Sequence, residues 1–137
     1  MMTYALDTNV IIDYLRNNLS VTKNMINAYI DGHILALPTV SYYEVYRGFK
    51  GANETKKFKR FQELCKILKF LYMDRDNVKI FHISAQIYTA LCQKGQKIED
   101  NDIYIAATAI ANDAVLVTDN IKHFSRIDGL KSVSWKE

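Results

Sequence analysis

The sequence predicts an α/β fold of three layers, in which helices cover both faces of a short, mostly parallel sheet. Short apolar segments with the continuous pattern of buried strands alternate with longer segments in which apolar residues recur at helical spacing. Strands that are buried on both faces carry apolar side chains without the alternation of a half-exposed strand. Strands and helices that follow one another in this order are typical of a parallel sheet.

The expected strands are short and apolar. Ala114–Thr118 is rich in β-branched residues, and Pro38 ends an earlier apolar run because proline cannot donate to a strand ladder. Residues Leu68–Met73 fit either the end of a helix or a strand. The other expected strands are Tyr4–Leu6, Ile34–Leu37 and Lys131–Trp135.

Six segments are expected to be helical because their apolar residues recur every three or four positions. In the last of them, Ile103, Ala106, Ala107 and Ile110 share one face. The six segments are about Asn9–Arg16, Val21–Ile30, Val40–Phe49, Asn53–Leu68, Asn77–Gln93 and Asn101–Asn112.

The composition indicates a single globular domain spanning residues 1–137. Of these residues 49% are apolar and 24% are charged, and the net charge of +3 permits a polyanionic partner without requiring one. The longest apolar run, Ile103–Ala111, is about half of the roughly 20 residues that a membrane helix needs. We therefore expect no membrane partner and a cytoplasmic location. Cys65 and Cys92 lack a CxxC spacing, which indicates buried free thiols in a reducing compartment.

Carboxylates follow several of the apolar segments. Asp7 follows the first strand, Glu44 lies early in the helix after the second, and Asp119 follows the strand at 114–118. These three should meet where the parallel strands end, and Asp102 joins them if its helix begins at the same edge. Carboxylates that gather in this way repel one another unless a cation lies among them. Oxygen ligands favour a hard ion such as Mg²⁺ or Mn²⁺.

Each acid also has a structural explanation. Asp7 can cap the helix that follows it, and Asp102 can interact favourably with the dipole at the start of its own helix. Ser41 to Glu44 matches a capping box, S-x-x-E. Asp119 and Asn120 can form a polar turn. Taken together, the four acids favour a common site, because one fold then explains all of their positions.

Four blocks of sequence carry a family resemblance. The segments "ALDTNVIIDYL", "SYYEVYRG", "DNDIYIAATAIANDAVLVTDNIKHFSRIDGL" and the terminal "SW" resemble a PIN domain, specifically the VapC toxins of bacterial toxin–antitoxin pairs. The resemblance spans Tyr4 to Trp135. It implies an α/β/α sandwich and a divalent-metal-dependent endoribonuclease that cuts structured RNA, such as tRNA or rRNA, to arrest translation. It also implies a small VapB-like antitoxin that blocks the active site, and a homodimer.

The resemblance assigns roles residue by residue. Asp7 matches the first acid of the family, with Asn9 as its supporting residue, and Glu44 matches the second acid. Among neighbouring acids, the following "IYIAA" identifies Asp102 as the third. Asp7 and Asp102 are then expected to bind Mg²⁺, or Mn²⁺ in its place, while Glu44 positions a metal-bound water and is itself a possible ligand.

The fourth family position is divided between two residues. The pattern after "VT" places the last acid or an asparagine at Asn120, whereas this chain has an acid at Asp119. We expect Asp119 to contribute to catalysis in an outer-shell or second-metal role, with Thr118 and Asn120 as supporting residues. The number of ions, one or two, stays open.

Basic residues indicate where RNA would bind. Between Arg47 and Lys69 the chain has eight basic residues against two acids, Glu54 and Glu63. This excess predicts contacts with the RNA backbone, and the alternative is a solvated helix face. The residues expected to bind RNA are Arg47, Lys50, Lys56, Lys57 and Arg60.

Other residues near these segments have open roles. Tyr42, Tyr43 and Tyr46 either stack on bases or pack in the core, with the core favoured for two of the three. Lys122 and His123 either face the substrate or have a plain surface role. Under the resemblance, Tyr14 and Tyr29 are expected at a dimer face.

The sequence argues against other chemistries. It contains no G-x-S-x-G elbow, Walker A loop or G-x-G-x-x-G fingerprint, and its histidines lack metal-ligand spacing. Phosphotransferases of the haloacid dehalogenase type need a second aspartate where this chain has Asn9. The functional alternative is a catalytically idle PIN-like module that binds RNA or a partner protein for regulation.

Overall fold

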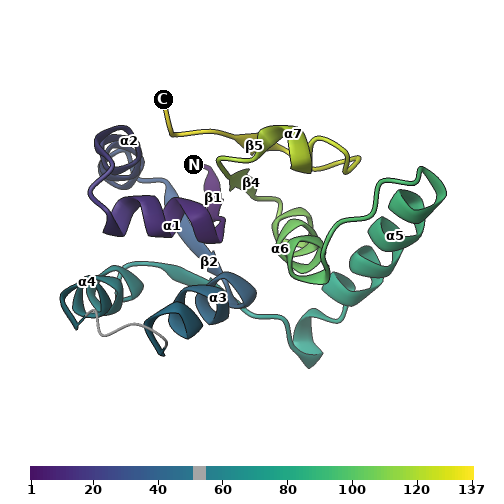
Figure 1. Ribbon diagram of the computed structural model, residues 1–137, viewed down its shortest axis with the longest axis horizontal. Coiled ribbons are helices and arrows are strands. Elements are labelled where there is room, and N and C mark those ends of the chain that lie inside the picture. The colour runs from purple at the N-terminus through teal and green to yellow at the C-terminus, as the bar shows by residue number, and fades with distance from the viewer. Residues whose placement is uncertain (51–54) are drawn as a thin grey trace.

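The computed structural model describes residues 1–50 and 55–137 and contains a sheet of five parallel strands. Strand β1 lies at its centre, between β2 and β4, in the order β3-β2-β1-β4-β5 (Figure 1). This confirms the expected parallel sheet. The strands are β1 (Thr3–Leu6), β2 (Ile34–Pro38), β3 (Lys69–Leu71), β4 (Val115–Val117) and β5 (Ser132–Val133).

Helices cover both faces of the sheet, so the three-layer prediction is also confirmed. One face carries α1 (Thr8–Leu15), α2 (Leu19–Ile30) and α4 (Thr55–Cys65), and the other carries α5 (Lys79–Gln93) and α6 (Asp100–Ala111). Helix α3 (Thr39–Lys50) contacts both α1 and α6. Two short helices, η1 (Arg75–Asn77) and α7 (Ile121–Phe124), lie in the connections.

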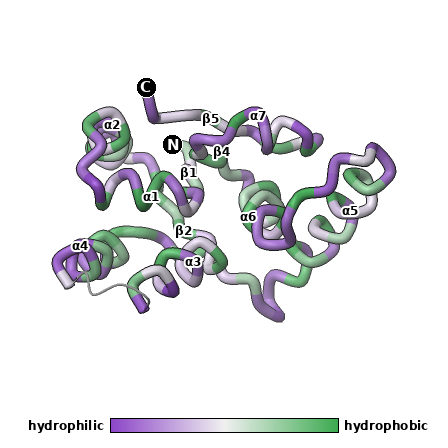
Figure 2. Tube along the Cα trace, viewed as in Figure 1, coloured by the Kyte–Doolittle hydropathy of each residue, from purple (hydrophilic) through white to green (hydrophobic). Residues whose placement is uncertain are grey.

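An apolar core lies between the sheet and each of the two helical layers, because successive strand residues point to opposite faces of the sheet. In β2, Leu35 and Leu37 belong to the core beneath α1, α2 and α4, whereas Ala36 belongs to the core beneath α5 and α6. Small residues of α6, such as Ala106 and Ala107, meet the alanines of the strands in this second core. Hydrophilic residues lie in the connections and also on helices such as α4 (Figure 2).

Several boundaries differ from those expected. Helix α4 ends at Cys65, and the ambiguous segment after it forms β3, while its expected start at Asn53 lies outside the described residues. Helix α7 was not expected. The two cysteines are free, as expected, but both are partly exposed, so the prediction that they are buried was wrong. Over the described part of the chain, no helix has the length and apolar character needed to cross a membrane.

Candidate active site

Asp7 is fixed where two central strands end. Leu6 pairs with Val117, and the backbone N–H of Asp7 continues the ladder by donating to the carbonyl of Val117 over 2.9 Å. Thr118 follows that strand directly, and its hydroxyl donates to Asp7 Oδ2 over 2.8 Å. Asp7 is only 4% exposed and Thr118 is fully buried, so this carboxylate has one well-defined orientation.

Asp7 also caps helix α1. Its Oδ1 accepts a hydrogen bond of 2.8 Å from the backbone N–H of Thr8. Burial raises the pKa of Asp7 to about 6, against the lowering effect of the bonds from Thr118 and Thr8. The nearby charges of Asp102 and Glu44 raise this pKa further. The capping role and the cluster of acids therefore exist together.

Glu44, on helix α3, contacts Thr8, the residue after Asp7. Its Oε1 accepts a bond of 2.6 Å from the hydroxyl of Thr8, and its Oε2 lies 3.5 Å from Asn101 Nδ2. The capping-box explanation does not hold, because α3 begins at Thr39 and Ser41 therefore lies inside the helix. The buried hydroxyl of Ser41 has no hydrogen-bond partner in the structure as described.

Asp102 reaches the same edge from the first turn of helix α6. The sequence did not determine whether α6 begins at this edge of the sheet. The structure shows that it does, because Asn101 in the first turn of α6 contacts Glu44. Burial raises the pKa of Asp102. The contact with His123 lowers this pKa, and the charges of Glu44 and Glu99 raise it further. His123 Nε2 lies 3.0 Å from Asp102 Oδ2. Asp7, Glu44 and Asp102 thus come together from three different elements.

Asp119 faces a different acid, Asp13, which the sequence analysis missed. Burial and the neighbouring Asp13 raise the pKa of Asp119 to about 7, with Asp7 adding to the effect and Lys136 opposing it. Neither Asp13 Oδ2 nor Asp119 Oδ1, both buried, has a hydrogen-bond partner among the described residues, and a proton on Asp119 would satisfy both. Lys136 lies 3.4 Å from Asp13 Oδ1. In the sequence, the one sign that Asp13 is buried is its position three residues after Val10, on the apolar face of α1.

Of the three supporting residues, Thr118 makes the direct contact with Asp7. Its hydroxyl also accepts a bond of 3.0 Å from the backbone N–H of Asn120. Asn120 and Asn9 are exposed, and no side-chain hydrogen bond joins either of them to Asp7 in the described residues.

Comparison with known proteins shows to which family the chain belongs. A sequence model of the PIN domain matches residues 4–130. The chain belongs to the PIN-domain family. This PIN domain is 31% identical over 134 residues to Ribonuclease VapC2 of Rickettsia felis, with 98% of both chains covered. It is 33% identical over 127 residues to Ribonuclease VapC1 of Methanocaldococcus jannaschii, covering 91% of this chain and 82% of the relative.

The fold of this PIN domain is also that of one chain in a solved VapBC structure. A chain in the crystal structure of VapBC2 from Rickettsia felis, bound to a DNA fragment from the promoter, superposes with a TM-score of 0.89. The two chains are 27% identical, and the match covers 98% of this chain and 100% of the other. The family resemblance drawn from the sequence is therefore confirmed.

The acids of this PIN domain suit a hard divalent cation. Among residues 1–50 and 55–137, no group of three acidic, histidine or cysteine side chains is arranged to hold a metal ion. Mg²⁺ needs fewer protein ligands, because it binds through one or two carboxylates and keeps several waters. The raised pKa values of Asp7 and Asp102 reflect burial and crowded negative charge, which a cation would relieve.

The basic residues fall into two groups. Arg47 and Lys50 are exposed near the end of α3, where Arg47 lies over the ring of Tyr43 at 5.1 Å and pairs with Glu44 at 3.5 Å. On α4, Lys56 is exposed and Lys57 is half-buried. Arg60 instead donates to the carbonyls of Leu15 and Tyr14, over 2.8 and 3.2 Å. Arg60 therefore holds the end of α1.

Two of the three tyrosines on α3 pack inward, as the sequence analysis favoured. Tyr42 contacts Phe61 and Phe70, and Tyr46 stacks on Tyr42. Tyr43 is 55% exposed and remains the one available for stacking on a base.

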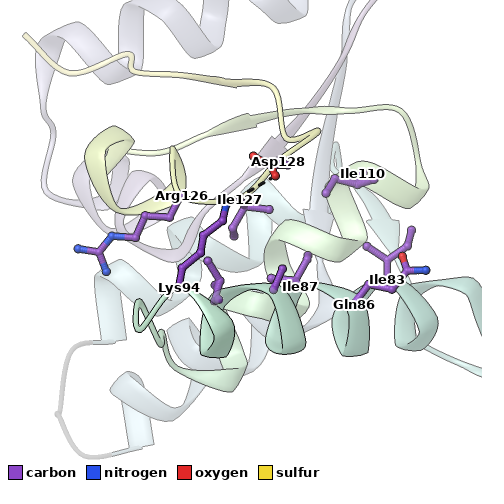
Figure 3. Close-up of a pocket in the computed structure, with 10 residues that line it drawn as sticks. Ile83, Gln86, Ile87, Lys94, Ile110, Arg126, Ile127 and Asp128 are labelled. Atoms are coloured by element: carbon purple, nitrogen blue, oxygen red, sulfur yellow. Dashed lines mark ion pairs between the residues drawn. The ribbon is translucent and has the colours of Figure 1, made fainter.

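Two cavities differ in their relation to the acids. One of about 200 Å³ lies between α1 and α3 and has Glu44, Arg16 and Lys57 in its wall. The other, of about 260 Å³, lies between α5 and the segment after α7 (Figure 3). Four isoleucines line it together with the ion pair of Lys94 and Asp128 at 3.6 Å, and Asp7, Glu44, Asp102 and Asp119 are not among its lining residues.

Proposed function

We propose that this PIN domain is a metal-dependent endoribonuclease and the toxin of a toxin–antitoxin pair. The observation that carries the proposal is the convergence of Asp7, Glu44 and Asp102 from three elements where the central strands end. Two relatives that share 31% and 33% of its residues are named ribonucleases. The catalytically idle alternative is not favoured, because all three acids are present and share one edge of the sheet.

The ion we propose is Mg²⁺, with Mn²⁺ able to replace it, bound by Asp7 and Asp102. When bound, it lowers the pKa of a coordinated water and neutralises charge on the phosphate under attack. The residues of the chain fix the geometry. Thr118 holds Asp7 in place, and Thr8 and Asn101 direct Glu44 so that it can orient the attacking water and accept its proton.

The proposed substrate is structured RNA, such as tRNA or rRNA, whose cleavage would arrest translation. The cations of Arg47 and Lys50 on α3, and of Lys56 and Lys57 on α4, would contact its phosphates outside the acidic cluster. Exposed Tyr43, with Arg47 beside its ring, would support a base next to them. Arg60 is already committed to the end of α1, which makes its contribution to RNA binding the weakest of the five residues expected.

The proposed protein partners are a small VapB-like antitoxin and a second copy of the chain. The antitoxin is supported by the fold shared with the VapBC2 complex of Rickettsia felis. For the homodimer, Tyr29 is 54% exposed and accessible, whereas Tyr14 lies beneath Arg60 at 5.2 Å.

The test is cleavage of a mixed pool of structured RNA by the purified protein. We expect cleavage with Mg²⁺ or Mn²⁺, none after EDTA, and recovery when the ion is added back in excess. Asp31→Asn, at an exposed position after α2, is the matched control and should cleave as the wild type does. Undiminished cleavage in EDTA would contradict the proposal.

A further inference from the structure

Among the described residues, His123 is the one whose side chain forms a hydrogen bond with the carboxylate of Asp102. Its Nε2 lies 3.0 Å from Asp102 Oδ2, and the tautomer that is protonated at Nε2 donates to the ionised carboxylate, which can only accept. In the part of the chain that the structure describes, the other carboxylate oxygen, Oδ1 of Asp102, has no hydrogen-bond partner. The sequence left two roles open for His123, facing the substrate or a plain surface role.

The position of the His123 ring is well defined. The ring packs edge-on against Phe124 with centroids 5.2 Å apart, and Phe124 is only 1% exposed. Both residues belong to α7, which begins three residues after Thr118 at the end of β4. The segment that fixes Asp7 through Thr118 therefore also fixes Asp102 through His123.

A purely structural purpose explains this contact poorly. The side chains of His123 and Asp102 are 22% and 31% exposed, and a partly exposed pair of this kind adds little to stability. Helix α7 is already anchored by the buried ring of Phe124 and by the backbone N–H groups of His123 and Phe124, which donate to the carbonyl of Asn120.

We infer that His123 is a positioning residue, which orients the carboxylate of Asp102 so that its free oxygen faces the divalent cation. This inference rests on the metal-dependent function proposed above. Groups that hydrogen-bond to a ligating carboxylate generally set its orientation, and removing one typically weakens metal binding by about 10- to 100-fold.

The test is titration calorimetry with Mn²⁺ alone, without RNA. His123→Ala and His123→Leu both lose the donor, and leucine keeps the apolar contact with Phe124 if alanine disturbs the fold. Both should bind Mn²⁺ about tenfold more weakly than the wild type, with a similar melting temperature. His123→Gln restores a donor and should recover most of the affinity. His82→Ala, at an exposed position on α5, should have no effect.

The outcomes separate this inference from the proposed function. Unchanged Mn²⁺ affinity in His123→Leu would overturn the inference while leaving a metal-dependent enzyme intact. Affinity as low in His123→Gln as in His123→Leu would also overturn it, because the hydrogen bond would not be the cause. Absence of Mn²⁺ binding by the wild type would overturn both the inference and the metal requirement.

Discussion

The carboxylate of Asp7 has two tasks that its position allows together. One oxygen caps helix α1 and the other accepts from Thr118, yet each oxygen retains a lone pair for a further ligand. Burial and two neighbouring acids keep its pKa near 6, so at neutral pH it is mostly ionised but in an unfavourable environment. A divalent cation would stabilise this charge, which links the stability of the site to its chemistry.

Glu44 provides a test of chemistry against structure at a single residue. Glu44→Gln keeps an oxygen that can accept from Thr8 and loses two weak contacts of Oε2, the ion pair with Arg47, whose side chain is 55% exposed, and the 3.5 Å contact with Asn101. We expect the melting temperature to change little, while cleavage falls by about 10²- to 10⁴-fold through loss of the base. Calorimetry and cleavage rates measure the two effects.

The control for this variant is Glu63→Gln, which removes an exposed carboxylate paired with Lys66. It should leave both quantities unchanged. A lower melting temperature and normal cleavage in Glu44→Gln would show that Glu44 is structural.

The positions of the acids that directly follow strands could be predicted from the sequence, whereas the position of Asp13, within helix α1, could not. Asp7 and Asp119 could be placed because parallel strands end at a common edge. Asp13 could not, because its burial depends on packing against Asp119 and Lys136, and Lys136 is 123 residues away. The sequence also could not show that Asp119 turns toward Asp13, since that is a matter of side-chain orientation.

At the scale of elements, Arg60 connects helix α4 to the C-terminal end of α1. Its guanidinium donates to two carbonyls there and lies over Tyr14. Arg60→Ala should lower the free energy of unfolding by about 1–3 kcal/mol, because the variant cannot form the hydrogen bonds that the charged group donates. Urea denaturation measures this, with exposed Lys59→Ala as the control. An unchanged midpoint would show that Arg60 is dispensable for stability.

The exposed lysines of α4 are expected to act on RNA instead. The double variant Lys56→Ala, Lys59→Ala should weaken RNA binding and reduce the salt slope by about 0.7 for each single-strand phosphate that a lysine no longer neutralises. Binding measured at several salt concentrations tests this, and Lys79→Ala, at the start of α5, is a control on another helix. An unchanged slope would make this face of α4 a solvated surface.

Most elements were predictable from periodicity, and the exceptions have physical reasons. Helix α7 has four residues, too few for a helical period to be visible. Strand β3 has three, and only its pairing with β2 distinguishes it from the end of α4. Asn101 was missed for another reason, since its contact with Glu44 depends on how α3 and α6 approach each other.

At the scale of the whole molecule, the fold places the acids outside the two apolar cores and at the ends of β1 and β4. The charge gathered there should make the stability of the metal-free protein depend on pH. The pKa of Asp7 is about 6 and that of Asp119 about 7, both above the ordinary value of 3.8. Groups with raised pKa values in the folded state favour folding at low pH, and this contribution is lost as the pH rises through those values.

Asp7→Asn removes one of these groups and should reveal its contribution. As the pH rises from 5 to 8, the melting temperature of the metal-free wild type should fall relative to that of Asp7→Asn. Added Mg²⁺ should stabilise the wild type more at pH 8 than at pH 5, because the ion competes with the proton. A difference that does not change with pH would contradict the raised pKa of Asp7.

The most direct test of the central claim is the rate of RNA cleavage by Asp7→Asn at saturating Mg²⁺, measured beside the wild type. Asparagine keeps an oxygen that can cap α1, so the variant should fold, and circular dichroism checks this. We predict that the folded variant shows no cleavage above the background of the RNA alone. Cleavage at the rate of the wild type would contradict the role of Asp7 as a metal ligand.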